Sequence, residues 1–328
     1  MAEPAIGIVG SGSWGTALAQ VLARSGHEVV LWGRDGAAMA RIARSRVNGR
    51  YLPGILLHPS IRFTADLLAL DACRILLLAV PAQKLRETVW GIEHRGRVLV
   101  VCAKGLERTS HRRLSEVLAE ECPDCTPAVL SGPSFASEVA RGLPTALTVA
   151  APAIALAREL AEELGSSSFR LYPCDDLVGV EIAGALKNVV AIAAGIVMGR
   201  GYGENARAAL ITRGLAEITR LGMALGARRE TLAGLSGMGD LVLTATSLTS
   251  RNTRFGFELG CGAPLDSLTG SGAPLCEGVW TARAACEMAA EKGVELPVSE
   301  AVARIVEGDW SVSEAVAALL SRPPAASE

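Results

Sequence analysis

The chain has 328 residues and a formal net charge of −2. This charge provides no broad basic field to attract nucleic acid or anionic lipid. An aromatic content of 4% also argues against a surface on which bases stack. The length is typical of about two domains.

The first predicted elements are a buried strand, a glycine-rich loop and a helix. The strand is the run IGIV at residues 6–9, and the loop is GSGSWG at residues 10–15, before an Ala/Leu-rich helical pattern. Gly10 permits a tight turn, Gly12 lets the backbone approach a pyrophosphate, and Gly15 allows close helix–strand packing. The N-terminus of the helix offers N–H groups and a positive dipole to phosphates. The context predicts a dinucleotide site; the alternative is a glycine-rich turn that binds nothing.

Further short apolar runs predict a parallel sheet that is covered on both faces. These strands are expected at residues 28–32, 75–80, 98–102, 128–130 and 147–149. Because they alternate with helical or turn patterns, we predict an α/β domain over residues 1–180 with a Rossmann-like, doubly wound parallel sheet.

Beyond residue 180 the strand candidates disappear and long helical patterns predominate. We predict an all-α C-terminal domain over residues 181–320 and a disordered tail over residues 321–328. The helices are expected at residues 177–198, 205–225, 241–246, 254–259, 279–292, 297–307 and 312–320.

The hydrophobic segments predict a cytoplasmic protein without stable membrane insertion. The mean hydropathy is +0.32, but the most apolar stretch, residues 189–198, is shorter than the roughly 18 residues that span a bilayer. The N-terminal residues lack the pattern of a signal peptide.

Eight cysteines lie mostly within apolar segments and are interpreted as reduced core residues. Cys122 and Cys125 have the C-x-x-C spacing of metal or redox sites, but no second pair matches them. We therefore expect no metal.

Residues that follow the predicted strands are candidates for ligand binding, because ligands bind beyond the carboxyl ends of the strands in such sheets. Lys104 follows the strand at residues 98–102, and its ammonium would suit an anionic substrate; alternatively, it is a solvated surface lysine. Gly132 lies in the turn after the next strand, and a ligand role for Ser134 is left open.

Arg34 follows the second strand, where NAD-specific folds usually carry an acidic residue for the ribose 2′-hydroxyl. An arginine there can bind a 2′-phosphate. Asp35 comes next and could still turn inward, so NADP or NAD is expected, with NADPH used at least as well as NADH.

Lys187 is the candidate proton-transfer group, since none of the four histidines lies in a glycine-flanked loop at a strand end. It lies in the most apolar predicted helix, where burial would lower its pKa toward the working range. Small residues on the same face, including Gly195, would let a cofactor ring approach. The alternative is a lysine whose ammonium reaches water from a core helix.

Two further helix starts carry candidate residues. Asp240 follows a Gly-Met-Gly turn and can cap the next helix, with or without a role in a site. Ser250, Arg251 and Asn252 open another helix, where an arginine beside free N–H groups suits a phosphate. The alternative is an exposed arginine at a helix start.

Nine segments, spanning about residues 6–315, carry a resemblance to a known family. They are GSGSWGTALA, LLLAVPA, CAKGLE, SGPSFASEVARGLPTA, EIAGALKNVVAIAAGI, NARAALITRGLAEITRLG, GMGDLVLTATS, SRNTRFG and CEGVWTA. Together they resemble the bacterial type of NAD(P)-dependent glycerol-3-phosphate dehydrogenase.

The resemblance implies reversible reduction of dihydroxyacetone phosphate to sn-glycerol 3-phosphate for phospholipid synthesis, by a homodimer. The implied catalytic residues are Lys187, as proton acceptor in the oxidation direction, Asp240 and Lys104. The implied cofactor-binding residues are Gly10, Gly12, Ser13, Trp14, Gly15, Arg34, Lys104, Ala136, Arg251 and Glu277. The implied substrate-binding residues are Lys104, Gly132, Ser134, Lys187, Asp240, Ser250, Arg251 and Asn252.

Two other functions compete with this interpretation. The first is another two-domain dehydrogenase with a catalytic lysine, of the β-hydroxyacid or 6-phosphogluconate type; the cluster at residues 250–252 argues against it. The second is a catalytically inactive, NADP-sensing regulator on the same fold, which predicts loss of the lysine, yet Lys187 is present.

Overall fold

The computed structural model describes residues 6–270 and 275–322. The chain forms two compact units, Met1–Lys104 with Arg112–Glu181 and Gly105–His111 with Ile182–Glu328. Residues 105–111, which the sequence placed in the first domain, therefore lie with the second unit. Of the tail expected at residues 321–328, residues 323–328 lie outside the described residues.

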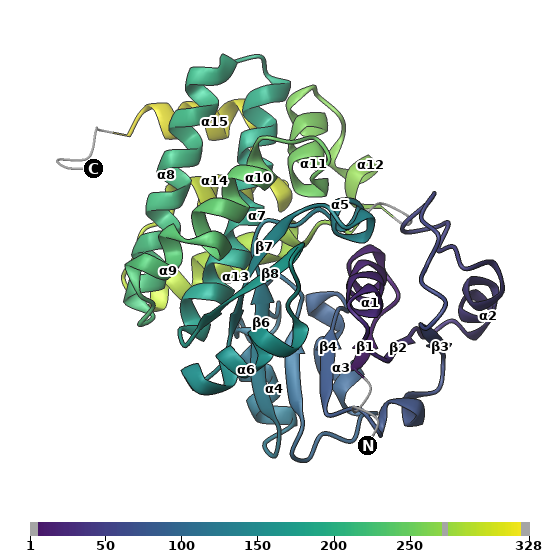
Figure 1. Ribbon diagram of the computed structural model, residues 1–328. Helices are drawn as coiled ribbons and strands as arrows, with labels where there is room; N and C mark the ends of the chain where they lie inside the picture. Colours follow the sequence, from purple (N-terminus) through teal and green to yellow (C-terminus); the bar gives the residue numbers. More distant parts are fainter. Residues whose placement is uncertain (1–5, 271–274, 323–328) are drawn as a thin grey trace. The chain divides into compact units, whose positions relative to one another are not determined.

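The first unit is built on an eight-stranded sheet with the order β3-β2-β1-β4-β5-β6-β7-β8 (Figure 1). The strands are β1 (Ile6–Val9), β2 (Val29–Trp32), β3 (Arg62–Thr64), β4 (Ile75–Leu78), β5 (Val98–Val101), β6 (Thr126–Ser131), β7 (Thr145–Ala150) and β8 (Phe169–Cys174). From β3 to β6 all neighbours are parallel. The order reverses between β1 and β4, which is where such sheets bind ligands. The predicted Rossmann-like fold is confirmed.

Alternate strand residues face opposite sides of this sheet, and helices cover both sides. Ile8 and Leu77 belong to the core beneath α1, α5 and α6, whereas Val9 and Leu78 belong to the core beneath α3 and α4. The helices are α1 (Ser13–Arg24), α2 (Gly36–Ser45), α3 (Leu85–Val89), α4 (Leu114–Glu121), α5 (Ala136–Arg141) and α6 (Ile154–Leu164), with short 3-10 turns η1 (Leu67–Leu70) and η2 (Ala82–Lys84).

The sheet departs from the sequence prediction in three strands. β7 was expected to be parallel but pairs antiparallel with β6. The connection contains only α5, whose six residues span about 9 Å, too short to carry the chain back along the sheet for a parallel return. The edge strands β3 and β8 were missed because neither forms a continuous buried apolar run.

From Ile182 onward, the regular elements of the second unit are helices in the residues that the structure describes, as predicted. Its helices are α7 (Leu177–Gly199, which begins in the first unit), α8 (Gly203–Ala224), α9 (Arg229–Ala233), α10 (Asp240–Ala245), α11 (Arg251–Gly260), α12 (Leu265–Thr269), α13 (Glu277–Glu291), α14 (Pro297–Val306) and α15 (Val312–Leu320), with a π-helical turn η3 at Leu235–Gly239. The short elements α9, α12 and η3 were not predicted. A buried cluster around Ile192, Phe255 and Val302 forms the core.

Helix α7 matches the helix predicted at residues 177–198, but its apolar part extends beyond the stretch at residues 189–198 that the sequence analysis singled out. Its 23 residues have a window of mean hydropathy 1.8, enough by length and composition to cross a membrane. However, 89% of that window is buried inside the protein, as in the core helix of a globular fold. Glu181 and Lys187 within the helix both have ion-pair partners.

The small residues of α7 pack against another helix, which corrects the expectation that they leave room for a cofactor ring. A Cβ atom added to Gly195 would lie 2.1 Å from the Thr253 carbonyl oxygen. On α11, a Cβ added to Gly256 would lie 1.9 Å from the Ile192 carbonyl oxygen. The backbones of α7 and α11 are therefore in direct contact.

We predict that Gly195→Ala destabilises the protein. Alanine usually stabilises a helix relative to glycine by about 1 kcal/mol. Here the added methyl group would meet backbone, and overpacking of this kind costs roughly 1–3 kcal/mol. Urea unfolding should show a net loss of stability, while Gly49→Ala, where a Cβ would have no neighbour within 4 Å, should show little change. Equal stability of the two variants would contradict the close contact.

Candidate active site

The glycine-rich loop has a geometry that only glycine permits at two positions. Gly10 has a φ of 115°, and a Cβ at Gly15 would lie 1.9 Å from the Gly10 carbonyl oxygen. A Cβ at Gly12, by contrast, would have no atom within 4 Å. The loop therefore lies tightly against the start of α1 while the backbone at Gly12 faces open space.

Asn48 holds this loop in place and was missed in the sequence. Its buried side-chain amide donates hydrogen bonds to the Ser11 carbonyl oxygen at 2.9 Å and to Thr16 Oγ1 at 2.8 Å. Ser13 Oγ in turn donates to the Tyr51 carbonyl oxygen at 2.7 Å. No local pattern signals Asn48, because it lies 37 residues from Ser11 and meets the loop only in the folded chain.

These residues fit a dinucleotide. Within the part of the chain that the structure describes, no side chain caps the N-terminus of α1, so its first N–H groups point from a positive helix end. Trp14 Nε1 is buried and has no hydrogen-bond partner among the described residues. A phosphate-bearing ligand at Gly12 would supply acceptors to this end of the helix.

Arg34 and Asp35 lie just past the carboxyl end of β2, and both are exposed. The Asp35 carboxylate caps α2, accepting a hydrogen bond of 2.9 Å from the Ala38 N–H. The inward turn of Asp35 that the sequence left open is therefore not observed. The Arg34 side chain, at the same strand end, takes no part in this helix cap.

Lys104, Gly132 and Ser134 come together beyond the carboxyl ends of β5 and β6. Lys104 Nζ donates to the Gly132 carbonyl oxygen at 2.8 Å, and Ser134 Oγ donates to the same oxygen at 3.1 Å. Gly132 has a φ of 141°. Ala136 begins α5 immediately afterwards. The turn thus gathers an ammonium and a hydroxyl at one edge of the sheet.

In the second unit, Lys187 of α7 forms a buried ion pair with Asp240 of α10. The Nζ–Oδ1 distance is 2.9 Å, and the two residues are 6% and 1% exposed. Thr244 accepts a second hydrogen bond from Lys187 Nζ at 2.7 Å and donates to Asp240 Oδ1 at 3.2 Å. The carboxylate offsets the cost of burying the ammonium, so Lys187 does not extend to water.

This triad corrects one prediction and adds one residue. Asp240 does not cap a helix: it is the first residue of α10, where no side-chain cap is found among the described residues, and its carboxylate faces Lys187. Thr244 was missed, although its position four residues after Asp240 places both on one face of the helix.

The cluster at residues 250–252 opens α11 as expected. Ser250 Oγ accepts a hydrogen bond of 3.3 Å from the Thr253 N–H and caps the helix. Asn252 donates to Asn188 Oδ1 at 2.9 Å, and its own Oδ1 accepts from the Gly278 N–H at 3.1 Å. Asn252 therefore fixes α7, α11 and the start of α13 together, while Arg251 is exposed.

Glu277, the remaining cofactor candidate, is the first residue of α13 and is 9% exposed. It directly precedes Gly278, whose N–H bonds to Asn252. The structure thus brings Glu277 to the region of α7 and α11 that holds Asn188 and Asn252.

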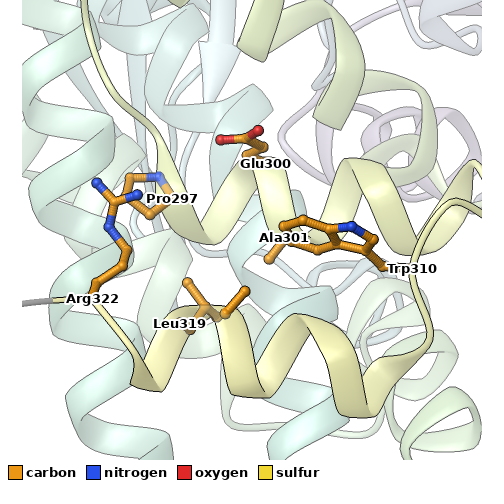
Figure 2. Close-up of a pocket in the computed structure, with 7 residues that line it drawn as sticks. Pro297, Glu300, Ala301, Trp310, Leu319 and Arg322 are labelled. Carbon is orange, nitrogen blue, oxygen red and sulfur yellow. The ribbon is translucent and has the colours of Figure 1, made fainter.

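A surface hollow between α14 and α15 does not involve any of these residues. Figure 2 shows side chains that line it, among them Trp310, Leu319 and Arg322. Its volume of about 250 Å³ includes space open to solvent, and small-molecule pockets usually measure about 300–1,000 Å³. Among residues 6–270 and 275–322, no group of three or more His, Cys, Asp or Glu is placed to hold a metal ion.

A Rossmann-like fold with an open glycine loop, joined to an all-α unit with a buried lysine–aspartate pair, is typical of two-domain NAD(P)-dependent oxidoreductases. Two family models match the chain: the N-terminal part of NAD-dependent glycerol-3-phosphate dehydrogenase at residues 5–157, and its C-terminal part at residues 176–317. The chain belongs to the glycerol-3-phosphate dehydrogenase family.

Individual relatives are similar to this chain over at least 97% of its length. Glycerol-3-phosphate dehydrogenase [NAD(P)+] from Parvibaculum lavamentivorans is 51% identical, covering 97% of this chain and 96% of the relative. The enzyme of the same name from Methylobacterium radiotolerans is 53% identical, with 98% of each chain covered. The crystal structure of glycerol-3-phosphate dehydrogenase from Coxiella burnetii is 40% identical and has a TM-score of 0.92, covering 98% of this chain and 99% of that one.

We predict that Asp240→Ala strongly destabilises the protein, because it leaves the Lys187 ammonium buried without its carboxylate. Breaking a buried pair in this way costs about 3–5 kcal/mol. Adding Lys187→Met should recover much of the loss. Urea unfolding of the three proteins measures both effects. The control is Lys84→Ala, which removes a half-exposed pair with Glu87 and should change stability by less than about 1 kcal/mol. A single Asp240 variant as stable as the control would refute the buried pair.

Proposed function

We propose that this protein catalyses the reversible NAD(P)-dependent reduction of dihydroxyacetone phosphate to sn-glycerol 3-phosphate, a precursor of phospholipids. The observation that carries the proposal is the buried Lys187–Asp240 pair in a chain that belongs to this family along its length. Reduction of a ketone requires a hydride at carbon and a proton at oxygen. The proposal assigns each requirement to residues of the chain.

The first unit holds the cofactor. The N–H groups at the start of α1, including those of Ser13, Trp14 and Gly15, bind the pyrophosphate, with Gly10 and Gly12 shaping the loop. Arg34 binds the adenosine end, and Ala136 contributes contact from the start of α5. NAD(P)H, when bound, supplies the hydride. We also assign Glu277 and Arg251 to cofactor binding, as the family motifs imply.

Lys187 moves the proton. In the reduction direction its ammonium donates a proton to the carbonyl oxygen, and in the oxidation direction its amine accepts the hydroxyl proton. Asp240 and Thr244 hold Nζ in position through the hydrogen bonds described above. These hydrogen bonds and the burial of Lys187, which is 6% exposed, support a fixed proton donor.

The substrate's phosphate requires cationic and N–H partners. Arg251 at the exposed start of α11 offers a guanidinium at a helix N-terminus, where Ser250 caps the Thr253 N–H and Asn252 bonds to Asn188. Lys104, which lies beside Gly132 and Ser134, provides a second cationic group for the substrate.

The proposed activity is tested by the fall in NADPH or NADH absorbance when substrate is added to the purified protein. Dihydroxyacetone phosphate should be reduced, whereas unphosphorylated dihydroxyacetone should be a poor substrate. Carbonyl acids of the kind that β-hydroxyacid dehydrogenases use serve as the comparison. Binding of NADPH without turnover of any of these compounds would support a regulatory protein instead.

We infer a homodimer, in accord with half-exposed apolar side chains such as Met223, Met238 and Val242 on the helical unit. We also infer a cytoplasmic protein without stable membrane insertion, supported by the burial of α7. Light scattering on the purified protein and fractionation of the expressing cells test these two points. A net charge of −2 supports the absence of a nucleic-acid partner.

Lys187→Ala is expected to lower kcat by roughly 10²–10⁴-fold, the usual effect of losing general acid–base help. NADPH should still bind, because the glycine loop is in the other unit. Thr244→Val should give a smaller loss, since it removes one hydrogen-bond partner of Nζ and leaves the Asp240 carboxylate in place. Stopped-flow turnover and fluorescence titration of NADPH measure the two properties, at temperatures where each variant is folded. Near-normal turnover in the Lys187 variant would transfer the role to Lys104.

Arg34→Ala is expected to weaken the use of NADPH more than that of NADH. An exposed guanidinium can make charge-assisted hydrogen bonds to a 2′-phosphate, whose loss corresponds to about tenfold or more in kcat/KM. Steady-state kinetics with both cofactors provide the measurement, and Arg41→Ala, an exposed change on α2, is the control. Equal losses with both cofactors would show that Arg34 does not read the 2′-phosphate.

A further inference from the structure

The C-x-x-C motif forms a compact turn in the first unit. Cys122 ends α4 as its C-cap residue, and Cys125 directly precedes β6. The Cys125 N–H donates a hydrogen bond of 3.0 Å to the Cys122 carbonyl oxygen. Pro123 and Asp124, the two central residues of the turn, are exposed.

This turn brings the two cysteines close enough to be linked. The Cα atoms at the ends of a four-residue turn lie within about 7 Å of each other, and disulfides span Cα distances of about 4.4–6.8 Å. The turn is also fixed from outside, since the Gly96 N–H donates to the Asp124 carbonyl oxygen at 2.9 Å. Pro123 restricts the backbone further.

The two thiols differ in a way that assigns them different roles. Cys122 is 1% exposed, whereas Cys125 is partly exposed. A hydrogen bond between the thiols lowers the pKa of Cys125 and raises the pKa of Cys122, which burial raises further. Cys125 is therefore the more accessible thiol and the one that more readily forms the nucleophilic thiolate.

We propose that Cys122 and Cys125 form a redox-active dithiol that exchanges with small-molecule disulfides. The Cys125 thiolate attacks one sulfur of the small disulfide, forms a mixed disulfide and releases the first small thiolate. The Cys122 thiol then gives up its proton and attacks Cys125 Sγ, which releases the second. The protein loses two electrons and two protons and gains one S–S bond, while the small disulfide becomes two thiols.

The position of the dithiol separates it from the proposed active site. Thr126, next to Cys125, pairs with Val98 at the amino ends of β6 and β5. Lys104 and Gly132 follow the carboxyl ends of the same two strands. Since the strands run parallel, the dithiol and these residues lie at opposite ends of β5 and β6. Oxidation of the dithiol is therefore expected to leave the reductase rate within about twofold of the rate of the reduced protein.

The test uses the full-length protein, reduced and then incubated with oxidised glutathione, followed by unfolding, alkylation and trypsin digestion. Peptide 114–141 contains Cys122 and Cys125 and no other cysteine. It should lose both alkylation sites, become lighter by two hydrogens and regain the sites with dithiothreitol. Peptide 63–74, which carries the buried Cys73 alone, should stay reduced and alkylate only after unfolding.

Two variants distinguish the roles of the thiols. Cys122→Ser should trap a glutathione adduct on Cys125, whereas Cys125→Ser should leave Cys122 reduced. Peptide 114–141 that stays fully reduced at excess oxidised glutathione, or an adduct that forms first on Cys122, would overturn the proposal. The experiment measures a peptide mass, so its result does not depend on whether the protein reduces dihydroxyacetone phosphate.

Discussion

The second unit is organised around the burial of one ammonium group. Lys187 lies in the most apolar helix of the chain, where an unpaired charge would cost several kcal/mol. Its partner, Asp240, is on α10, so α10 must be held against α7. Thr253 Oγ1 of α11 donates to the Thr244 carbonyl oxygen at 2.6 Å, which ties α10 to α11. The glycine contacts of α7 with α11 complete the arrangement, because only backbones without side chains can approach so closely.

The constraint in the first unit is to keep a tightly turned loop open to a ligand. Gly10 holds a positive φ, and the loop lies against the start of α1, yet the backbone at Gly12 remains uncovered. Hydrogen bonds from Asn48 to Ser11 and Thr16 fix the loop, so the N–H groups on its exposed side remain available to a ligand. A rigid loop needs no reordering when an anion binds, which lowers the entropic cost of binding.

The strands that run parallel, from β3 to β6, also give the first unit two chemically distinct ends, the carboxyl ends and the amino ends of these strands. The carboxyl ends carry the glycine loop, Arg34 and the Lys104 cluster, whereas the amino ends of β5 and β6 carry the turn with Cys122 and Cys125. The amino ends are separated from the carboxyl ends by the length of a strand, which is about 13 Å for four residues. Thiol chemistry at the amino ends of the strands is therefore compatible with ligand binding at their carboxyl ends.

The sequence by itself determined the features that depend on neighbouring residues. The glycine spacing, the continuous apolar strands and the helical periodicity predicted the Rossmann-like sheet and nearly every long helix of the second unit, because these patterns reflect local backbone preference and burial. It also singled out Lys187 and Asp240, since a lysine in an apolar helix and an aspartate after Gly-Met-Gly are unusual by position alone.

Only the tertiary structure decided which residues meet. It paired Lys187 with Asp240 across 53 positions of sequence, assigned Asp35 to a helix cap, and brought in Asn48 and Thr244. It also turned β7 antiparallel and placed the small face of α7 against α11. These outcomes depend on contacts between segments far apart in the chain, and the free energy of such contacts is fixed by packing geometry that no local pattern encodes.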